Sequence, residues 1–238
     1  MKILIICGHG EGDPGACACN CQEATLVREY APMLQKSLSQ YADVDLFDMS
    51  KNMYKRLKNG HSFNFKNYDY VLELHFNAAA SDPTGNGKTT GTEILVHPNE
   101  KGTSVEQAIL NNICALGFKN RGVKTRTNLL NMNTCKGKQG VSYALLETCF
   151  IDDMDDVKLY KSKKEAIVSA ITNGIVSGFG LKASKSKTLT SANDITHELC
   201  SSYFPITEVD NFVKALDEAK KNNSPLYWGY YKLANKIK

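Results

Sequence analysis

The feature that most constrains this chain is a short apolar run, residues 2–7, which stops at a glycine-rich stretch. A β-branched run of this kind, without polar alternation, is typical of a strand buried in the middle of a sheet. Residues 8–15 then contain four glycines and a proline, which predicts a tight, irregular loop. That loop has neither a GxGxxG nor a GxxxxGK[ST] pattern, so the sequence gives little support for phosphate binding.

Beyond this loop, strand-like and helix-like segments alternate. The predicted strands cover residues 44–47, 69–75, 92–96 and 141–146, with an extended segment at 123–130. The first predicted helix begins at Glu23, and others cover 105–116, 153–160 and 164–179, while residues 51–58 predict a basic helix or turn. Pro32 lies inside the first helical pattern and should kink it or split off a turn. The alternation predicts an α/β domain, with a twisted mixed β-sheet flanked by helices on both faces.

The predicted strand at residues 69–75, with the two residues that follow it, is the most informative segment. Apolar side chains at 70, 72, 74 and 76 alternate with Val71, Glu73, His75 and Asn77, so one face is apolar and the other increasingly polar. Taken alone, this pattern fits a half-exposed edge strand with a solvated histidine. His9 changes this interpretation, because it follows the first strand just as His75 follows this one.

Composition restricts the classes of function. Of 238 residues, 42% are hydrophobic, which is enough for one sizeable core and a small appendage. The net charge of +4 points to neither nucleic-acid binding nor a membrane surface. No apolar run approaches the roughly 18–20 residues of a membrane span, and residues 2–7 are too short for a signal peptide. We therefore expect a protein made in the cytoplasm, with reduced cysteines rather than a disulfide framework.

Four polar residues should meet at one rim of the sheet, because ligands of α/β domains bind at the carboxyl ends of strands. His9 and His75 follow two strands, Glu147 ends a later one, and Glu23 begins the helix that leaves the first loop. Two histidines and a carboxylate with an open fourth position are the ligands of a catalytic zinc, which lowers the pKa of its bound water to about 7. A second carboxylate would then act as acid and base. Spacing alone does not say which carboxylate binds the metal.

Four motifs resemble one enzyme family, in the expected order over residues 1 to about 181. They are Gly8-His9-Gly10 with Asp13-Pro14-Gly15-Ala16, then Gln22-Glu23-Ala24, then Glu73-Leu74-His75-Phe76-Asn77-Ala78, and finally Leu146-Glu147-Thr148-Cys149-Phe150-Ile151. Together they look like the zinc-dependent N-acetylmuramoyl-L-alanine amidases of phage endolysins and bacterial autolysins. Two features depart from the pattern: the cysteines at 17, 19 and 21, and Glu11 where glycine is common.

The resemblance implies zinc held by His9, Glu23 and His75, with Glu147 as the catalytic acid and base. It also implies hydrolysis of the amide between N-acetylmuramic acid and L-alanine of the stem peptide in peptidoglycan. Glu29 competes with Glu23 for the ligand position, but it lies nearly two turns deeper in the helix. Asp152 and Asp153 compete with Glu147, although they more simply cap the next helix.

Several neighbouring residues have two interpretations. Glu73 shares the face of His75 and is either its hydrogen-bond partner or part of a core salt bridge. Arg121, Lys124 and Arg126 border the cleft and meet substrate carboxylates, or they form a solvated strand edge. Asn77 orients a ligand or substrate, or shapes the turn after its strand. A second metal site at the Cys17–Cys21 cluster is less favoured than a loop with free thiols.

The composition changes after Leu181. Residues 182–193 are almost without apolar side chains and predict a flexible linker. Residues 194–238 predict a small all-α domain with a wall-binding or accessory role. So short a unit has little core, so we also expect it to be stabilised by packing or self-association. Trp228 is expected in its core, although its aromatic neighbours also suit sugar binding.

The leading hypothesis is a bacteriolytic phage endolysin that stays in the host cytoplasm until lysis and then degrades a Gram-positive cell wall. Its partner would be peptidoglycan, with no nucleic acid and no membrane insertion. A zinc peptidase or deacylase of related fold is the alternative enzyme. A non-catalytic wall-binding protein on the same scaffold is the alternative from another class.

Overall fold

The computed structural model describes residues 1–79, 81–183, 218, 220–222 and 224. By contacts the chain divides into two units, Met1–Ser184 and Lys185–Lys238. Nearly all described residues belong to the first unit. The predicted linker, the helical module at 194–238 and the proposed core position of Trp228 lie almost wholly outside the described residues. None of the described helices is long and apolar enough to cross a membrane.

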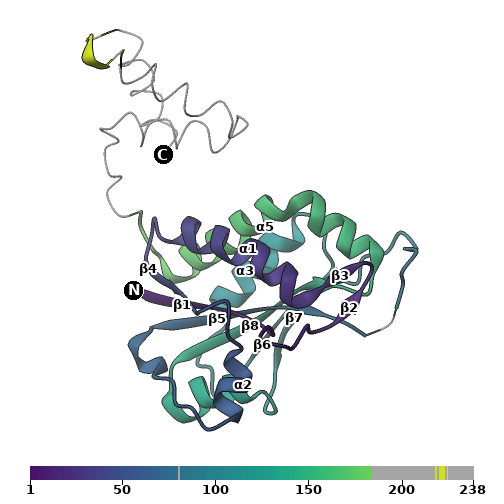
Figure 1. Ribbon diagram of the computed structural model, residues 1–238, viewed down its shortest axis with the longest axis horizontal. Coiled ribbons are helices and arrows are strands. Elements are labelled where there is room, and N and C mark those ends of the chain that lie inside the picture. Colours follow the sequence, from purple (N-terminus) through teal and green to yellow (C-terminus); the bar gives the residue numbers. More distant parts are fainter. Residues whose placement is uncertain (80, 184–217, 219, 223, 225–238) are drawn as a thin grey trace. The chain divides into compact units, whose positions relative to one another are not determined.

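The first unit is built on a six-stranded mixed sheet in the order β4-β1-β5-β8-β6-β7 (Figure 1). The strands are β1 (Lys2–Cys7), β4 (Asp43–Leu46), β5 (Tyr70–Asn77), β6 (Thr92–Val96), β7 (Asn120–Thr125) and β8 (Ser142–Phe150). Neighbouring strands are parallel except β6 and β8, which run antiparallel. β1 lies between β4 and β5, which explains why its residues 3–7 are all buried.

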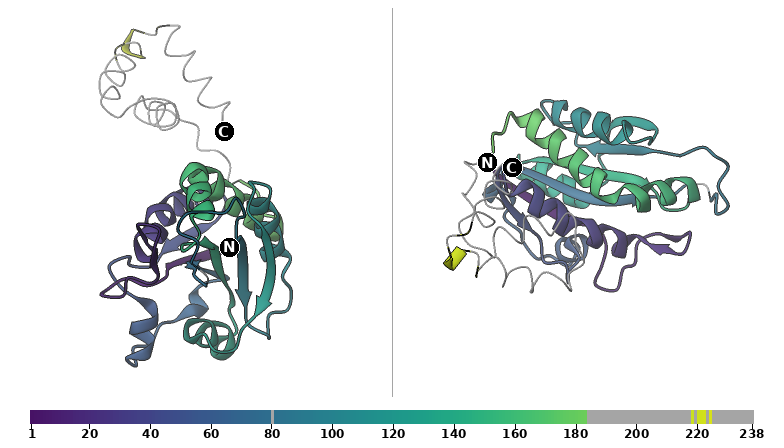
Figure 2. Two further views of the ribbon diagram at one scale, coloured as in Figure 1. Left: turned by 90° about the vertical axis from the view of Figure 1, so that its right-hand side faces the viewer. Right: turned by 90° about the horizontal axis from the view of Figure 1, so that it is seen from above.

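Helices cover both faces of this sheet. One face carries α1 (Glu23–Leu38), α3 (Ser104–Cys114) and α5 (Met154–Phe179), which lie side by side above the sheet (Figures 1 and 2). The other carries shorter segments: α2 (Met53–Lys58), the 3₁₀ turn η1 (Phe65–Asn67), α4 (Leu130–Met132) and the π-helical turn η2 (Asn133–Lys138). Each face has its own buried apolar cluster. The predicted mixed sheet with helices on both faces is confirmed.

Side chains of residues 70–77 alternate between the two faces of the sheet, as the sequence pattern predicts. Tyr70, Leu72, Leu74 and Phe76 are buried in the larger apolar cluster, under the three long helices. Val71 belongs to the smaller cluster, and Glu73 and His75 follow it at spacings of two residues on the same face. The strand is therefore internal, between β1 and β8, and the edge-strand interpretation is wrong.

Several predicted boundaries differ from the structure. α1 continues through Pro32 as a single helix, because its buried face of Leu26, Tyr30, Leu34 and Leu38 offsets the lost hydrogen bond. β8 runs on to Phe150, so Glu147 lies within the strand rather than at its end. The segment expected to be extended to residue 130 leaves the strand at Thr125 and turns into α4 and η2. The predicted break between two helices near residue 163 is confirmed by non-helical dihedral angles at Lys163 within α5.

A small hairpin, β2 (Cys17–Ala18) and β3 (Cys21–Gln22), was not predicted. Its two turn residues, Cys19 and Asn20, have positive φ angles of 48° and 57°. Positive φ at both central positions is the geometry of a tight hairpin turn, for which Asn is usual but Cys is not. The three cysteines are free thiols, as are the other cysteines among the described residues.

Candidate metal centre

The parallel arrangement of three strands determines where the site lies. β1 pairs with β5, and β5 with β8, each in parallel, so their carboxyl ends meet at one edge of the sheet. His9 lies two residues beyond β1, and His75 is the sixth residue of β5. Glu147 on β8 is the direct register partner of His75. The topology thus places residues far apart in sequence beside one another.

His9 is held in an unusual backbone conformation by its loop. Its φ angle is +59°, and Gly10 follows with a φ of +90°. The Arg28 guanidinium donates to the carbonyl oxygens of Gly8 and His9, at 3.0 Å each, and to that of Ala24 in its own helix at 2.9 Å. It also donates to Met49 O at 2.9 Å. Arg28 therefore fixes the loop against α1, a role that helical spacing did not reveal.

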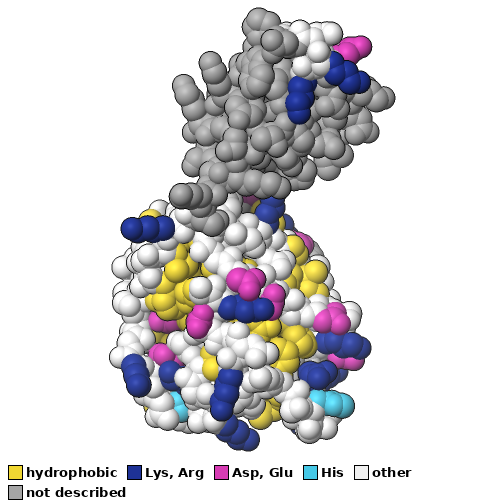
Figure 3. Space-filling model, turned by 90° about the vertical axis from the view of Figure 1, so that its left-hand side faces the viewer, with side chains coloured by type: hydrophobic (Ala, Val, Ile, Leu, Met, Phe, Trp, Pro, Cys, Tyr) yellow, Lys and Arg dark blue, Asp and Glu magenta, His cyan; other side chains and the backbone are white. Residues whose placement is uncertain are grey.

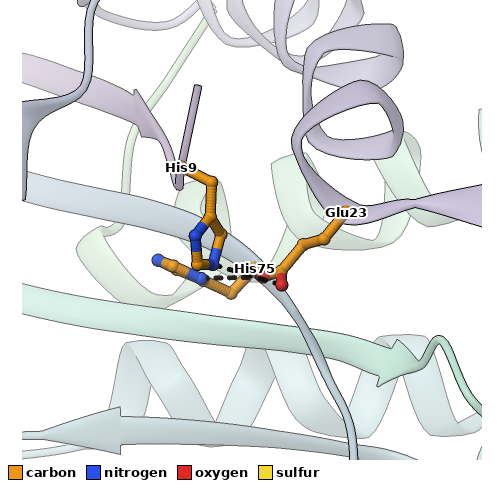
Figure 4. Close-up of side chains that lie close together, drawn as sticks. All are labelled: His9, Glu23 and His75. Atoms are coloured by element: carbon orange, nitrogen blue, oxygen red, sulfur yellow. Dashed lines mark hydrogen bonds and ion pairs between the residues drawn. The ribbon is translucent and has the colours of Figure 1, made fainter. Parts of the chain in front are cut away.

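Glu23 is the first residue of α1, and it is 3% exposed. Its Oε1 accepts from the backbone N–H of Phe76 at 2.9 Å, and its Oε2 accepts from that of Ala16 at 3.0 Å. The same two oxygens face His75 Nδ1 at 2.9 Å and His9 Nε2 at 3.1 Å. Figure 4 shows the three side chains converging from a loop, a helix start and a strand.

Two glycines leave the space for this convergence. A Cβ at Gly8 would overlap the imidazole ring of His75. A Cβ at Gly15 would lie 2.7 Å from both Glu23 Oε2 and His9 Cδ2, at a φ of +68° that also disfavours a side chain. The Gly-rich loop is therefore needed for close approach as well as for its turns.

The donor and acceptor pattern fits a bound cation. His9 and His75 each face a carboxylate at both ring nitrogens, with Asp13 Oδ2 3.1 Å from His9 Nδ1 and Glu73 Oε1 3.0 Å from His75 Nε2. A neutral imidazole has one N–H, so one nitrogen of each ring turns a lone pair toward a carboxylate. The repulsion between this lone pair and the carboxylate is removed if the rings are protonated or if a cation binds among His9, Glu23 and His75. Their ligand atoms lie within 4.8 Å of one another, and imidazole and carboxylate are ligands that zinc prefers.

The electrostatics of the metal-free residues agree with this. Burial alone would lower the pKa of His75, but the contacts with Glu23 and Glu73 raise it well above the usual value. Burial would raise the pKa of Glu23, yet the two histidines lower it. The cluster thus accumulates a positive charge next to the carboxylate, whether from protons or from a metal ion.

Glu147 lies beside this cluster and remains free to exchange a proton. Its Oε2 is buried with no hydrogen-bond partner in the described part of the chain. Burial raises its pKa to about 7, with Glu23 and Glu93 adding to the shift and His75 opposing it. A carboxyl group with a pKa near neutrality suits proton transfer in both directions.

Glu93 was not singled out from the sequence, yet it is the cross-strand partner of Glu147. It is 4% exposed and its Oε2 accepts from Arg121 Nε and Lys124 Nζ, each at 2.6 Å. Asn77 Nδ2 donates to its other oxygen at 3.3 Å. Three predicted substrate-contacting residues are therefore engaged by one buried carboxylate.

The remaining predicted positions are placed as follows. Arg126 is exposed just beyond β7, and its guanidinium donates to Thr125 O at 3.0 Å. Asp153 caps α5, accepting from the N–H groups of Asp155 and Asp156, as the sequence indicated. Glu29 pairs with Lys164 at 2.6 Å and is not part of the histidine cluster.

A second group of carboxylates, Asp82, Asp153 and Asp155, also lies within ligand distance. Its oxygens accept mainly from backbone N–H groups, including those of Asn86 and Gly87 to Asp155 at 2.9 Å. These hydrogen bonds tie the loop after β5 to the start of α5. We therefore assign this group a structural role.

A pocket of about 250 Å³ opens beside the histidines, on the face that carries α2 and α4. Besides His9 and His75, its lining includes Tyr54, Asn128, Leu129 and Leu130. It gives a substrate room next to the candidate metal position.

Over the face drawn in Figure 3, basic and acidic side chains are interspersed with small hydrophobic areas.

A mixed α/β sheet with two histidines, a bridging carboxylate and a second, neighbouring glutamate has the layout of a metal-assisted hydrolase. The family model described as N-acetylmuramoyl-L-alanine amidase matches residues 3–177. The chain belongs to this family, and the family predicted from the four motifs is confirmed.

Individual relatives agree. The chain is 29% identical over 193 residues to a probable autolysin of Staphylococcus aureus, covering 74% of this chain but 38% of that protein. It is 28% identical over 197 residues to a sporulation-specific N-acetylmuramoyl-L-alanine amidase of Bacillus subtilis, covering 79% and 72%. The catalytic domain of the CD27L endolysin targeting Clostridia difficile superposes with a TM-score of 0.58 at 27% identity, covering 74% and 97%.

Proposed function

We propose that this protein is a zinc-dependent peptidoglycan amidase that cleaves between N-acetylmuramic acid and L-alanine of the stem peptide. The observation that carries the proposal is the convergence of the ligand atoms of His9, Glu23 and His75 within 4.8 Å, beside Glu147, whose Oε2 has no hydrogen-bond partner among the described residues. His9 Nε2, a Glu23 oxygen and His75 Nδ1 would hold the ion. A bound zinc ion would polarise the scissile carbonyl and acidify a water molecule.

The protein's own residues supply the rest of the chemistry. Glu147 takes a proton during attack and delivers it to the departing L-alanine amine. Asn77, Arg121 and Arg126 are proposed to contact the substrate, and for Arg121 this requires sharing its guanidinium with Glu93.

The family membership and the likeness to an endolysin catalytic domain support an endolysin that acts on a Gram-positive wall. In this proposal the enzyme is made in a phage-infected host and reaches the wall at lysis, causing cytolysis. Residues 194–238 would serve wall binding or another accessory role, with self-association as a further possibility. Sedimentation of the full chain and of a chain ending at residue 183 tests the self-association.

Digestion of purified Gram-positive wall tests the reaction. An amidase releases new L-alanine amino termini without new reducing sugar ends, whereas a peptidase releases other amino termini. His75→Ala should lose both bound zinc and activity, and a chelator should abolish activity in the wild type. Full zinc occupancy in His75→Ala would contradict the ligand assignment, and new termini other than L-alanine would contradict the amidase.

A non-catalytic wall-binding protein is the remaining alternative. Glu147→Gln separates the two possibilities, because it preserves shape while removing the acid and base. Loss of hydrolysis with retained wall binding supports the enzyme. If the wild type and Glu147→Gln bind the wall equally and the wild type does not hydrolyse it, the result would support the binding protein.

A further inference from the structure

Both histidines of the candidate metal centre have a second carboxylate on the ring nitrogen that faces away from Glu23. Asp13 Oδ2 lies 3.1 Å from His9 Nδ1, and Glu73 Oε1 lies 3.0 Å from His75 Nε2. The two pairs differ in exposure. The Asp13 side chain is 33% exposed, whereas that of Glu73 is 5% exposed.

Glu73 is itself held by two further side chains. Asn131 Nδ2 donates to both of its oxygens, at 3.0 and 2.9 Å, and the Tyr143 hydroxyl donates to Oε2. Tyr143 is fully buried and Asn131 nearly so. Both of these partners are donors, and an ionised carboxylate can only accept.

The backbone explains how these residues meet. Glu73 and His75 are two residues apart on β5 and so point to the same face of the sheet. Tyr143 is the register partner of Val71, which makes it a diagonal neighbour of Glu73 on β8. Asn131 comes from α4, the short helix that the sequence did not predict. Three segments, β5, β8 and α4, thus contribute to one buried hydrogen-bond network.

We propose that Glu73, held by Tyr143 and Asn131, is a positioning residue that fixes the tautomer of His75. The contact with Glu73 orients the ring before a metal ion arrives. When the ion binds, Nε2 keeps its proton and donates it to Glu73, whereas Nδ1 releases its proton and turns a lone pair toward the ion, on the side of Glu23. This inference rests on the metal centre of the proposed function and adds to it the residues that orient a ligand.

Asp13 acts in the opposite sense on His9. It accepts from Nδ1–H, which leaves Nε2 for the ion. Because this pair is more exposed, solvent weakens its effect. The two histidines therefore present different ring nitrogens to the same centre, and the buried pair with Glu73 makes the larger contribution.

Glu73→Gln tests the proposal through the zinc affinity of the full chain, measured by competition with a chromophoric chelator. A glutamine offers one acceptor oxygen to the three donors, where the carboxylate offers two. Carboxylates that orient metal-bound histidines typically contribute 10–100-fold in metal affinity, so we expect the zinc dissociation constant to rise by about that factor.

The matched control is Glu106→Gln. Glu106 is also buried, 2% exposed, and also accepts from a tyrosine hydroxyl, that of Tyr70 at 2.9 Å. It lies on α3, on the opposite face of the sheet from His75. The same chemical change there should leave zinc affinity unaltered. Equal loss of affinity in both variants would mean that the effect is general destabilisation, which would overturn the proposal.

A spectroscopic readout addresses the tautomer directly. In zinc-loaded protein labelled with ¹⁵N-histidine, we expect His75 to show a protonated Nε2 and His9 a protonated Nδ1. In Glu73→Gln the Nε2 proton of His75 should exchange faster with water. A protonated Nδ1 on His75 of the wild type would overturn the proposal, as would an unchanged zinc affinity of Glu73→Gln.

Tyr143→Phe provides a second variant should Glu73→Gln fail to fold. It keeps the buried ring and removes one donor to Glu73, so it should weaken zinc binding in the same direction but by less. Wild-type zinc binding without amide cleavage would refute the proposed function and leave this inference standing. Wild-type cleavage with zinc affinity unchanged in both variants would refute this inference alone.

Discussion

At the scale of single residues, the candidate site depends on which oxygens and nitrogens have partners. Every oxygen of Glu23 is engaged, by two backbone N–H groups and two imidazoles. Glu147 has an oxygen with no partner among the described residues. A fully engaged carboxylate suits a fixed ligand, and an unengaged one suits a group that exchanges protons.

The first prediction concerns this difference. Glu147→Gln should reduce wall hydrolysis by at least about 100-fold, because general acid–base groups contribute roughly 10²–10⁴-fold. Bound zinc should remain near the wild-type level, since Glu147 is not needed as a ligand. Metal analysis together with release of L-alanine termini measures both. A zinc-free variant would instead make Glu147 a ligand.

The second prediction concerns pH. The pKa of Glu147 is raised to about 7 in the fold, against roughly 4.3 in an unfolded chain, so its ionisation opposes folding as pH rises between these values. Below the unfolded pKa the group has no effect. In chelator-treated protein, the melting temperature of the wild type should fall relative to that of Glu147→Gln between pH 5 and pH 8. Parallel curves for the two proteins would contradict the raised pKa.

At the scale of elements, the site depends on how loops and helix starts are tied together. Arg28 joins three backbone segments, the His9 loop, α1 and the stretch around Met49, through hydrogen bonds to carbonyl oxygens. Lysine carries the same charge but cannot reproduce this planar set of donors.

The third prediction follows. Arg28→Lys should destabilise the fold by about 2 kcal/mol, because hydrogen bonds to charged groups contribute roughly 1.5–3 kcal/mol. Zinc affinity should also fall, since His9 loses its support. Urea unfolding and a zinc titration measure the two effects. Lys36→Ala, a change at an exposed position later in the same helix, is the control and should alter neither.

The elements also show how much could be predicted from sequence. Residue spacing predicted the strands of the main sheet and the long helices, because buried strands and amphipathic helices leave clear patterns. It also predicted that His9, Glu23, His75 and Glu147 meet at one rim, whereas their separate roles came from the family resemblance. Asn131 and Tyr143 could not be found this way, since α4 is three residues long and Tyr143 looks like an ordinary core residue. Glu93 pairs with Arg121 and Lys124 on the neighbouring strand, and Arg28 donates to backbone carbonyl oxygens of the His9 loop. A single sequence does not reveal such contacts.

At the scale of the whole molecule, a bound ion would link the helical layer to the sheet. Glu23 starts α1, His75 belongs to β5, and His9 lies on the loop between β1 and α1. An ion that binds the folded protein but not the unfolded chain stabilises it by mass action.

The fourth prediction is that zinc raises the melting temperature. At a free zinc concentration 100 times the dissociation constant, stabilisation is about 2.7 kcal/mol. For a unit of this size that corresponds to roughly 5–10 °C. Calorimetry with zinc and with chelator measures the shift. His75→Ala should show no such shift, and an equal shift in that variant would place the ion elsewhere.

The sheet order also has a consequence for synthesis on the ribosome. β4, β1 and β5 are adjacent and come from the first 77 residues, which include His9, Glu23 and His75. Glu147 enters on β8, about seventy residues later. The nascent chain therefore carries all of its proposed metal ligands well before the residue that would make it hydrolytic, so ion capture can precede catalytic competence during translation.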